Sequence, residues 1–174
     1  VEMDQWGYVF ATIPSNSTKS NVPTICLCSH MDTAPDCVGT NVKPIVHRQW
    51  DGSPITLPDD TTQVITKEQH PYLKEKIGDD IITASGLTLL GADDKAGVAI
   101  IMEMLEYFVK NDIPHKTIKV AFTPDEEIGG GIDSFNVNEF GADYAYTIDG
   151  GAYNEINYEN FNAASAIVKI NGLD

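Results

Sequence analysis

Basic residues are scarce in this sequence. Its 174 residues include 11 lysines and arginines against 26 aspartates and glutamates, which gives a formal net charge of −15. Proteins that bind nucleic acid or an anionic membrane surface depend on lysine and arginine for much of their affinity. We therefore expect neither of these partners. A surplus of carboxylates suits bound cations instead.

Cysteines and long apolar runs are few as well. The three cysteines, Cys26, Cys28 and Cys37, are odd in number and clustered. This is typical of small buried side chains in a reducing compartment and not of a disulfide framework. Because no run of about 18 apolar residues is present, we expect no membrane span. No secretory signal is visible either, so we expect a cytoplasmic protein.

The remaining pattern alternates short apolar runs with helical periodicity, which is typical of an α/β domain. A chain of this length forms one domain with a single core. It opens at Val1 without a methionine and stops at Asp174, close after an expected strand, so we expect it to be part of a longer protein. We predict strands near residues 1–13 (a hairpin about Gly7), 24–28, 80–84, 88–90, 118–122, 143–148 and 163–170, and helices near 71–75, 95–111 and 132–140.

Two details of this prediction concern local pairing and packing. The pieces 80–84 and 88–90 are expected to form a tight hairpin about Ser85-Gly86. The helix over 95–111 is expected to bury a continuous apolar stripe, formed by Val98, Ile101, Met102, Leu105, Phe108 and Val109.

Acidic residues or histidine follow several of the apolar runs directly. His30 and Asp32 follow the run 24–28, Glu126 and Glu127 follow 118–122, and Asp149 follows 143–148. Asp93 stands just before the helix. If the sheet is largely parallel, the carboxyl ends of its strands meet at one edge, where α/β proteins bind their ligands.

Each of these residues also has a simpler interpretation. His30 and Asp32 are equally consistent with a surface histidine beside a turn aspartate. Asp93 and Asp94 are also consistent with capping the N-terminus of the helix and with a favourable negative charge beside the helix dipole in the first turn. This interpretation explains one aspartate better than two. Glu126 and Glu127 taken alone suit a solvated acidic turn. The coincidence of several such strand ends shifts our interpretation toward a metal site.

The residue types favour a hydrolytic metal centre. Histidine with carboxylates suits zinc, manganese or cobalt better than a structural cysteine site. One metal needs only about three protein ligands, and this set is larger. It suits two metals that share a bridging carboxylate and a water, with a spare carboxylate as the general base.

Four motifs carry a resemblance to a known family. They are Ser29-His30-Met31-Asp32-Thr33, Gly91-Ala92-Asp93-Asp94-Lys95-Ala96-Gly97, Pro124-Asp125-Glu126-Glu127-Ile128-Gly129 and Ile148-Asp149-Gly150-Gly151. In this order and spacing the sequence resembles the co-catalytic zinc exopeptidases related to aminoacylase and carboxypeptidase G, and among them the tripeptide aminopeptidases. The resemblance covers nearly the whole chain. It implies a three-layer α/β/α sandwich with a mixed, largely parallel sheet, here incomplete.

The resemblance also implies a role for each site residue. His30 and Asp149 would bind the first metal, and Glu127 would bind the second. Asp93 would bridge the two, followed by a cis peptide bond, and Asp32 would orient His30. The remaining carboxylate, Glu126, would be the general base. The expected cofactors are two Zn²⁺ ions, with Mn²⁺ or Co²⁺ as alternatives.

The sequence departs from the family pattern at one ligand. The family's second metal carries a further histidine from a later segment, and no histidine follows Asp149 here. The family's lid domain and the segment that returns to the sheet are expected to be absent as well. We therefore predict that residues 1–174 are part of a catalytic domain, with weak binding of the second metal and little activity.

The expected function of the parent protein is release of the N-terminal residue from tripeptides, with short peptides as substrates. A dipeptidase, a deacylase or a carboxypeptidase on the same scaffold remains an alternative. A catalytically incompetent metal-binding fragment is another. The oligomeric state is open.

Overall fold

The centre of the fold is a mixed five-stranded sheet. The structure is a computed structural model, and it describes residues 1–159, 164 and 166–172. The strands lie in the order β1-β2-β8-β3-β9. Their bounds are Glu2–Met3 for β1, Val9–Ile13 for β2, Ile118–Thr123 for β8, Ile25–His30 for β3 and Tyr144–Thr147 for β9.

Strand direction brings three carboxyl ends to one edge of this sheet. Strand β3 runs parallel to β8 on one side and to β9 on the other, whereas β1 and β2 pair antiparallel. His30 is in register with Thr123, and Cys28 is in register with Thr147. The mixed α/β sheet is therefore confirmed, and its parallel part is the part that ends at the predicted site.

Helix α1 (Ala92–Lys110) covers one face of the sheet. Ile101, which is fully buried, packs with Leu27 of β3 and with the apolar side chains of β8. Asp93 and Asp94 have non-helical backbone angles, so the regular helix starts at residue 95, as predicted. The predicted stripe is wrong at Met102 and Val109, which are exposed, because they lie about 80–100° around the helix axis from the buried Ile101, at the margin of the face that packs on the sheet.

The segment after β8 covers the opposite face. It contains the 3₁₀ helix η2 (Glu126–Ile128) and the short helix α2 (Val137–Phe140). Phe135 and Phe140 pack against Phe10 with ring centroids 5.6 and 5.5 Å apart. Aromatic pairs at this spacing add to the burial of their area. The sheet thus lies between α1 and this segment, as a three-layer arrangement requires.

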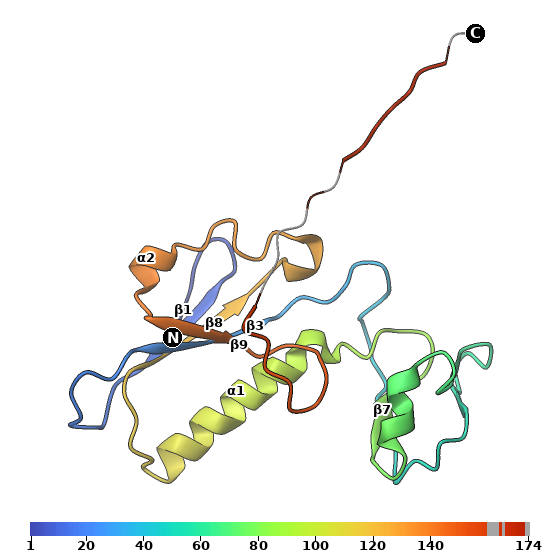
Figure 1. Cartoon of the computed structure of the whole chain (residues 1–174), viewed down its shortest axis with the longest axis horizontal. Coiled ribbons are helices and arrows are strands. Elements are labelled where there is room, and N and C mark those ends of the chain that lie inside the picture. The colour runs from blue at the N-terminus through green and yellow to red at the C-terminus, as the bar shows by residue number, and fades with distance from the viewer. Residues whose placement is uncertain (160–163, 165, 173–174) are drawn as a thin grey trace.

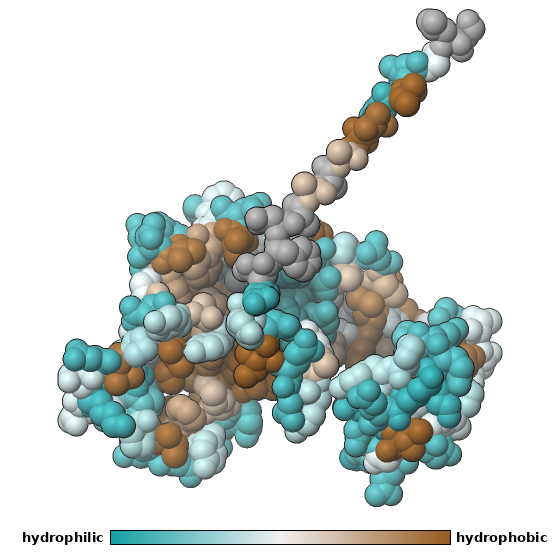
Figure 2. Space-filling model, in the orientation of Figure 1, coloured by the Kyte–Doolittle hydropathy of each residue, from teal (hydrophilic) through white to brown (hydrophobic). Residues whose placement is uncertain are grey.

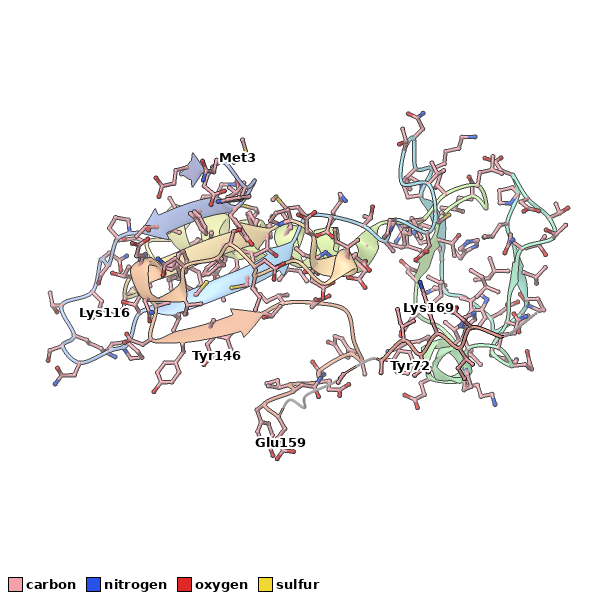
Figure 3. The ribbon with its side chains drawn as sticks, turned by 90° about the horizontal axis from the view of Figure 1, so that it is seen from above. Met3, Tyr72, Lys116, Tyr146, Glu159 and Lys169 are labelled. Carbon is pink, nitrogen blue, oxygen red and sulfur yellow. The ribbon has the colours of Figure 1, made fainter. Side chains whose placement is uncertain are left out.

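A small lobe, residues 45–85, lies beside the sheet (Figures 1 and 3). Trp50, Ile55 and Leu57 form a core of its own. Its elements are β4 (Ile45–His47), β5 (Ile55–Thr56), β6 (Val64–Ile65), the 3₁₀ helix η1 (Pro71–Lys76) and β7 (Ile81–Thr83). The visible face of this lobe is mostly hydrophilic, whereas the lobe that holds the sheet shows more hydrophobic surface (Figure 2).

Two predicted strands differ from the structure. The hairpin of 80–84 with 88–90 is wrong, because β7 pairs with β4 instead. The backbone groups around the expected turn form hydrogen bonds with other segments instead. The carbonyl oxygen of Ser85 accepts from the N–H of Asp59, and the N–H of Leu89 donates to the carbonyl oxygen of Val38. The predicted strand 163–170 lies partly outside the described residues, and positions 164 and 166–170 belong to no strand.

The structure also bears on the membrane question. Among the residues that it describes, no helix combines the length and the apolar character needed to cross a bilayer.

Candidate metal centre

One histidine lies at the centre of a group of carboxylates. His30, at the end of β3, is 3 % exposed. Its Nε2 lies 2.8 Å from Asp93 Oδ1, 3.8 Å from Glu126 Oε2 and 3.9 Å from Asp149 Oδ1. These acids come from the start of α1, from η2 after β8 and from the segment after β9. The parallel strand ends thus bring together residues that are far apart in the sequence.

Asp32 holds the other side of this group. Its carboxylate accepts hydrogen bonds from the backbone N–H groups of Glu126 and Glu127, at 3.2 and 3.0 Å, and lies 3.4 Å from Nδ1 of His30. Burial opposes ionisation of Asp32, but these hydrogen bonds outweigh it and lower its pKa. Asp32 therefore ties the turn that carries both glutamates to the end of β3.

The ring of His30 is oriented by the chain itself. Its Nδ1 lies 3.1 Å from the backbone carbonyl oxygen of Asp32. When Nδ1 carries the proton and donates it to this oxygen, Nε2 keeps its lone pair and faces the carboxylates. Histidine ligands in metal sites are oriented by such a bond from the second ring nitrogen.

The electrostatics of the group favour a cation. Burial works against protonation of His30, yet the hydrogen bond to Asp93 and the charges of Asp149 and Asp32 raise its pKa overall. Burial and the neighbouring carboxylates also raise the pKa of Glu126 and of Asp149. In the part of the chain that the structure describes, His30 is the only cationic ion-pair partner of these acids. A positive charge placed among them would relieve their mutual repulsion.

Asp94, which the sequence suggested only as an N-cap of the helix, also supports the group of site residues. It is 1 % exposed and accepts hydrogen bonds from Ser29 Oγ, from the backbone N–H of His30 at 3.2 Å and from the backbone N–H of Gly97 at 3.1 Å. The last bond has the geometry of an N-cap to the regular helix. Asp94 thus anchors the start of α1 to the end of β3. The preceding Asp93–Asp94 peptide bond is cis, as the resemblance implied.

Gly97 allows this close approach. An added Cβ there would lie 2.5 Å from Asp94 Oδ1 and 2.6 Å from Ser29 Oγ, and closest of all to the carbonyl oxygen of Ile148. Since real Cβ atoms do not come so near, only glycine fits. The first turn of α1 therefore packs directly on the ends of β3 and of the β9 segment.

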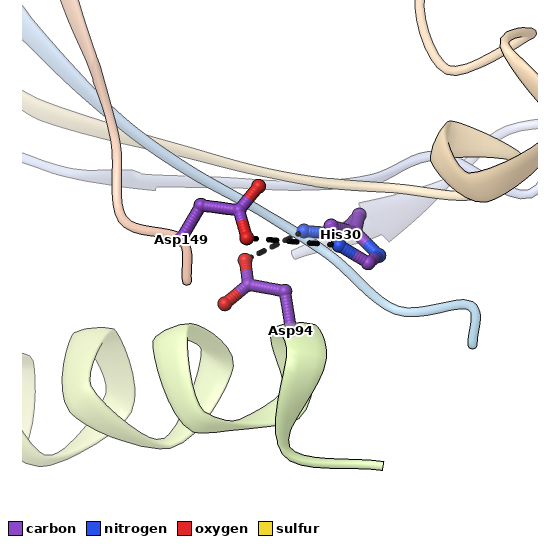
Figure 4. Close-up of side chains that lie close together, drawn as sticks. All are labelled: His30, Asp94 and Asp149. Atoms are coloured by element: carbon purple, nitrogen blue, oxygen red, sulfur yellow. Dashed lines mark hydrogen bonds and ion pairs between the residues drawn. The ribbon is translucent and has the colours of Figure 1, made fainter. Parts of the chain in front are cut away.

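Two groups of side chains have donor atoms within 4.8 Å of one another, which suits a shared metal ion. One is His30 with Asp93 and Glu127, and the other is His30 with Asp94 and Asp149 (Figure 4). In the second group, both oxygens of Asp94 already accept hydrogen bonds from the protein. We therefore regard Asp94 as a support. Asp93, Glu127 and Asp149, together with His30, have the nitrogen and oxygen donors that zinc and manganese accept.

All six predicted site residues lie in this one region, namely His30, Asp32, Asp93, Glu126, Glu127 and Asp149. The other histidines lie elsewhere: the Nε2 of His47 is 3.0 Å from Thr83 Oγ1, His115 lies next to the carbonyl of Lys116, and His70 is exposed. The sequence suggested the N-cap of Asp94, and both Ser29 and Asp94 lie within the family motifs, but their bonds to each other and to the end of β3 depend on tertiary packing.

Comparison with protein families gives a clear match. The model of peptidase family M20/M25/M40 matches residues 62–161. Peptidase T from Halothermothrix orenii is 50% identical over 175 residues, which cover 100% of this chain and 43% of that protein. Peptidase T from Listeria monocytogenes is 51% identical over 173 residues, or 99% of this chain and 42% of its own length. The chain thus spans about two fifths of these relatives.

Two solved structures share the fold. The aminopeptidase PepT from Bacillus cereus matches with a TM-score of 0.59 and 29% identity, over 84% of this chain and 30% of that chain. A tripeptidase from Staphylococcus aureus matches with a TM-score of 0.57 and 31% identity, over the same shares of the two chains.

Proposed function

The chain belongs to peptidase family M20/M25/M40, and from this premise we propose that it is the metal-binding part of an aminopeptidase that removes the N-terminal residue from tripeptides. The observation that carries the proposal is the group of Asp93, Glu126 and Asp149 around the buried Nε2 of His30. The peptidase T relatives and the tripeptidase from Staphylococcus aureus support the choice of short peptides as substrates.

We propose that the chain's donors divide between two cations. His30 and Asp149 would hold the first, Glu127 would hold the second, and Asp93 would be shared. The donor set suits Zn²⁺, with Mn²⁺ or Co²⁺ as alternatives. When bound, such cations supply Lewis acidity to the scissile carbonyl and to a water.

The chain's own residues supply positioning and proton transfer. Asp32 holds His30 and the turn of Glu126 and Glu127 in place through the hydrogen bonds described above. Glu126 is the proposed general base: its carboxylate takes a proton from the attacking water and gives it to the leaving amine. Its side chain is 53% exposed, so substrate and water can reach it.

The second cation has few protein ligands in this chain. Glu127 and the shared Asp93 are its proposed donors, and we expect a further histidine from a later segment of the parent protein. Residues 1–174 alone should therefore bind the second cation weakly and hydrolyse tripeptides slowly or not at all. Rapid tripeptide hydrolysis by this chain alone would refute that expectation.

The test of the reaction uses a protein extended to the length of the relatives. Glu126→Gln should nearly abolish tripeptide turnover and leave the metal content unchanged, because the amide keeps the shape but cannot accept the proton. Turnover that survives this change would overturn the role of Glu126.

A substrate panel on the same extended protein tests specificity. Tripeptides should be cleaved in preference to dipeptides, N-acyl amino acids and peptides with a blocked N-terminus. Preference for one of these others would identify a dipeptidase, a deacylase or a carboxypeptidase instead. Bound metal with no hydrolysis of any of them would indicate a metal-binding protein without catalysis.

A further inference from the structure

Two free cysteines lie side by side on the central strand. Cys26 and Cys28 of β3 share the face of the sheet opposite α1, and their Sγ atoms are 3.1 Å apart. Cys26 is 1 % exposed and Cys28 is half-buried. The third cysteine, Cys37, is exposed. Nothing in the proposed peptidase reaction uses this pair of thiols.

The strand works against a direct disulfide between them. Residues two apart on a strand are about 6.6–6.8 Å apart along it, whereas a disulfide brings its two Cβ atoms to about 3.5–4.5 Å. Strand β3 is held on both sides, by β8 and by β9, in continuous parallel register through both cysteines. To close a disulfide, the central strand would have to bend out of these two ladders. A single large atom placed between the sulfurs needs no such movement.

A cavity adjoins both cysteines. It has a volume of about 510 Å³, and both cysteines line it. Phe135, Val137 and Phe140 are among its apolar lining residues, and His30 and Asp149 are among its polar ones. The space next to the two sulfurs therefore accommodates an apolar organic group.

We propose that Cys26 and Cys28 form a dithiol site for monosubstituted trivalent arsenicals, with arsenic bridging the two sulfurs and its organic group in this cavity. In the reaction of an arsenoxide, both S–H bonds break and two As–S bonds form. The arsenic–oxygen bond breaks, and the oxygen leaves as water with the two thiol protons. Arsenic stays trivalent, so the step needs no oxidant or reductant.

The bridge also predicts the stability of the adduct. Two As–S bonds to one protein form a chelate, so release of one sulfur leaves the arsenic tethered by the other, at high effective concentration for rebinding. An adduct on a single thiol has no such advantage. Excess monothiol should therefore strip a single-thiol adduct but leave the bridged one.

The test uses phenylarsine oxide with the 174-residue chain carrying Cys37→Ser, so that only the two strand cysteines remain. We expect one arsenic per chain by mass spectrometry and loss of both titratable thiols together. The adduct should survive excess 2-mercaptoethanol and be removed by 2,3-dimercaptopropanol. Loss of only one thiol per arsenic, or removal by the monothiol, would overturn the proposal.

Matched variants locate the site. Cys28→Ser in the Cys37→Ser background, a change on a half-buried side chain, should form at most an adduct that the monothiol strips. The unchanged chain should keep one arsenic after the monothiol treatment, because an adduct on the exposed Cys37 is stripped. Circular dichroism checks that each variant is folded. The thiol count is made on the chain that keeps both Cys26 and Cys28, so it remains a valid test even if Cys28→Ser does not fold. A stable adduct in Cys28→Ser would contradict the bridge. A protein that loses two thiols but gains no arsenic would show a disulfide, contrary to the strand geometry.

Discussion

Replacement of Gly97 by alanine tests the packing that builds the site. Gly97 lies in the first turn of α1, and the new Cβ would come within 2.5 Å of Asp94 Oδ1 and 2.6 Å of Ser29 Oγ. Its nearest obstacle is the main-chain carbonyl oxygen of Ile148. A side chain can rotate away, but the backbone of Ile148 is tied to β3 by the bond from its N–H to the carbonyl of Cys28, so we expect α1 itself to move outward.

The expected cost follows from two opposing effects. Inserting a methyl group into a filled space costs about 1–3 kcal/mol, or more where the surroundings cannot yield. Alanine favours the helix over glycine by about 1 kcal/mol, which offsets part of that cost. Because the obstacle is backbone, we expect a cost near the upper end of that range and, after the gain in helix propensity, a net loss of about 2 kcal/mol in the free energy of unfolding. For a chain of this size, each kcal/mol lowers Tm by about 2–4 °C.

The measurement is urea unfolding followed by circular dichroism. Gly151→Ala is the matched control, because a Cβ at Gly151 meets nothing within 4 Å, and it should change stability by less than about 0.5 kcal/mol. Cation binding should also weaken in Gly97→Ala, since the bond from Asp94 to the end of β3 is stretched. A Gly97→Ala chain as stable as the unchanged one, or more stable, would refute the close packing of α1 on the strand ends.

Three further predictions concern single site residues. Asp94→Ala leaves the buried backbone N–H groups of His30 and Gly97 without an acceptor and takes from Ser29 Oγ one of its two acceptors. It should cost about 3–5 kcal/mol in urea unfolding; a loss below 1 kcal/mol would contradict its anchoring role. Asp32→Asn should lower cation affinity about 10–100-fold by calorimetry, and an unchanged affinity would show that Asp32 does not orient His30. Burial and the charges of Asp94 and Asp93 raise the pKa of Asp149. A carboxyl group whose pKa is raised in the folded state costs stability once the pH rises through that pKa. Asp149→Asn should therefore raise the Tm of the metal-free chain at pH 7, but should not raise it at a pH below the usual pKa range of carboxyl groups. The same change should weaken cation binding, and a lower Tm at pH 7 would show that Asp149 is not repelled by its neighbours.

Sequence pattern predicted the part of the site that strand ends determine. His30, Glu126 and Asp149 follow three apolar runs, and these runs are the parallel neighbours β3, β8 and β9. Because the carboxyl ends of parallel strands meet at one edge of a sheet, the apolar runs were enough to predict that these three residues lie close together. Asp93 comes from a helix start, so its place in the group depended on the family motif. The catalytic and metal-binding roles of these residues stay predictions.

What the sequence did not predict depends on contacts between distant backbone groups. The pairing of β7 with β4 replaces the local hairpin, since main-chain bonds of Ser85 and Leu89 go to other segments. Asp94 became an anchor because Gly97 lets the helix approach the strand ends. Helical periodicity placed Ile101 in the core but could not say how wide the buried stripe is, and Met102 fell outside it.

The metal content of this chain after zinc loading and dialysis, measured by elemental analysis, tests whether the residues around His30 bind a metal. We expect about one tightly held zinc per chain, lost in His30→Ala and in Asp93→Ala. His70→Ala, on an exposed histidine outside the site, should retain it. No bound zinc in the unchanged chain, or equal zinc in all four proteins, would contradict a metal centre at the end of β3.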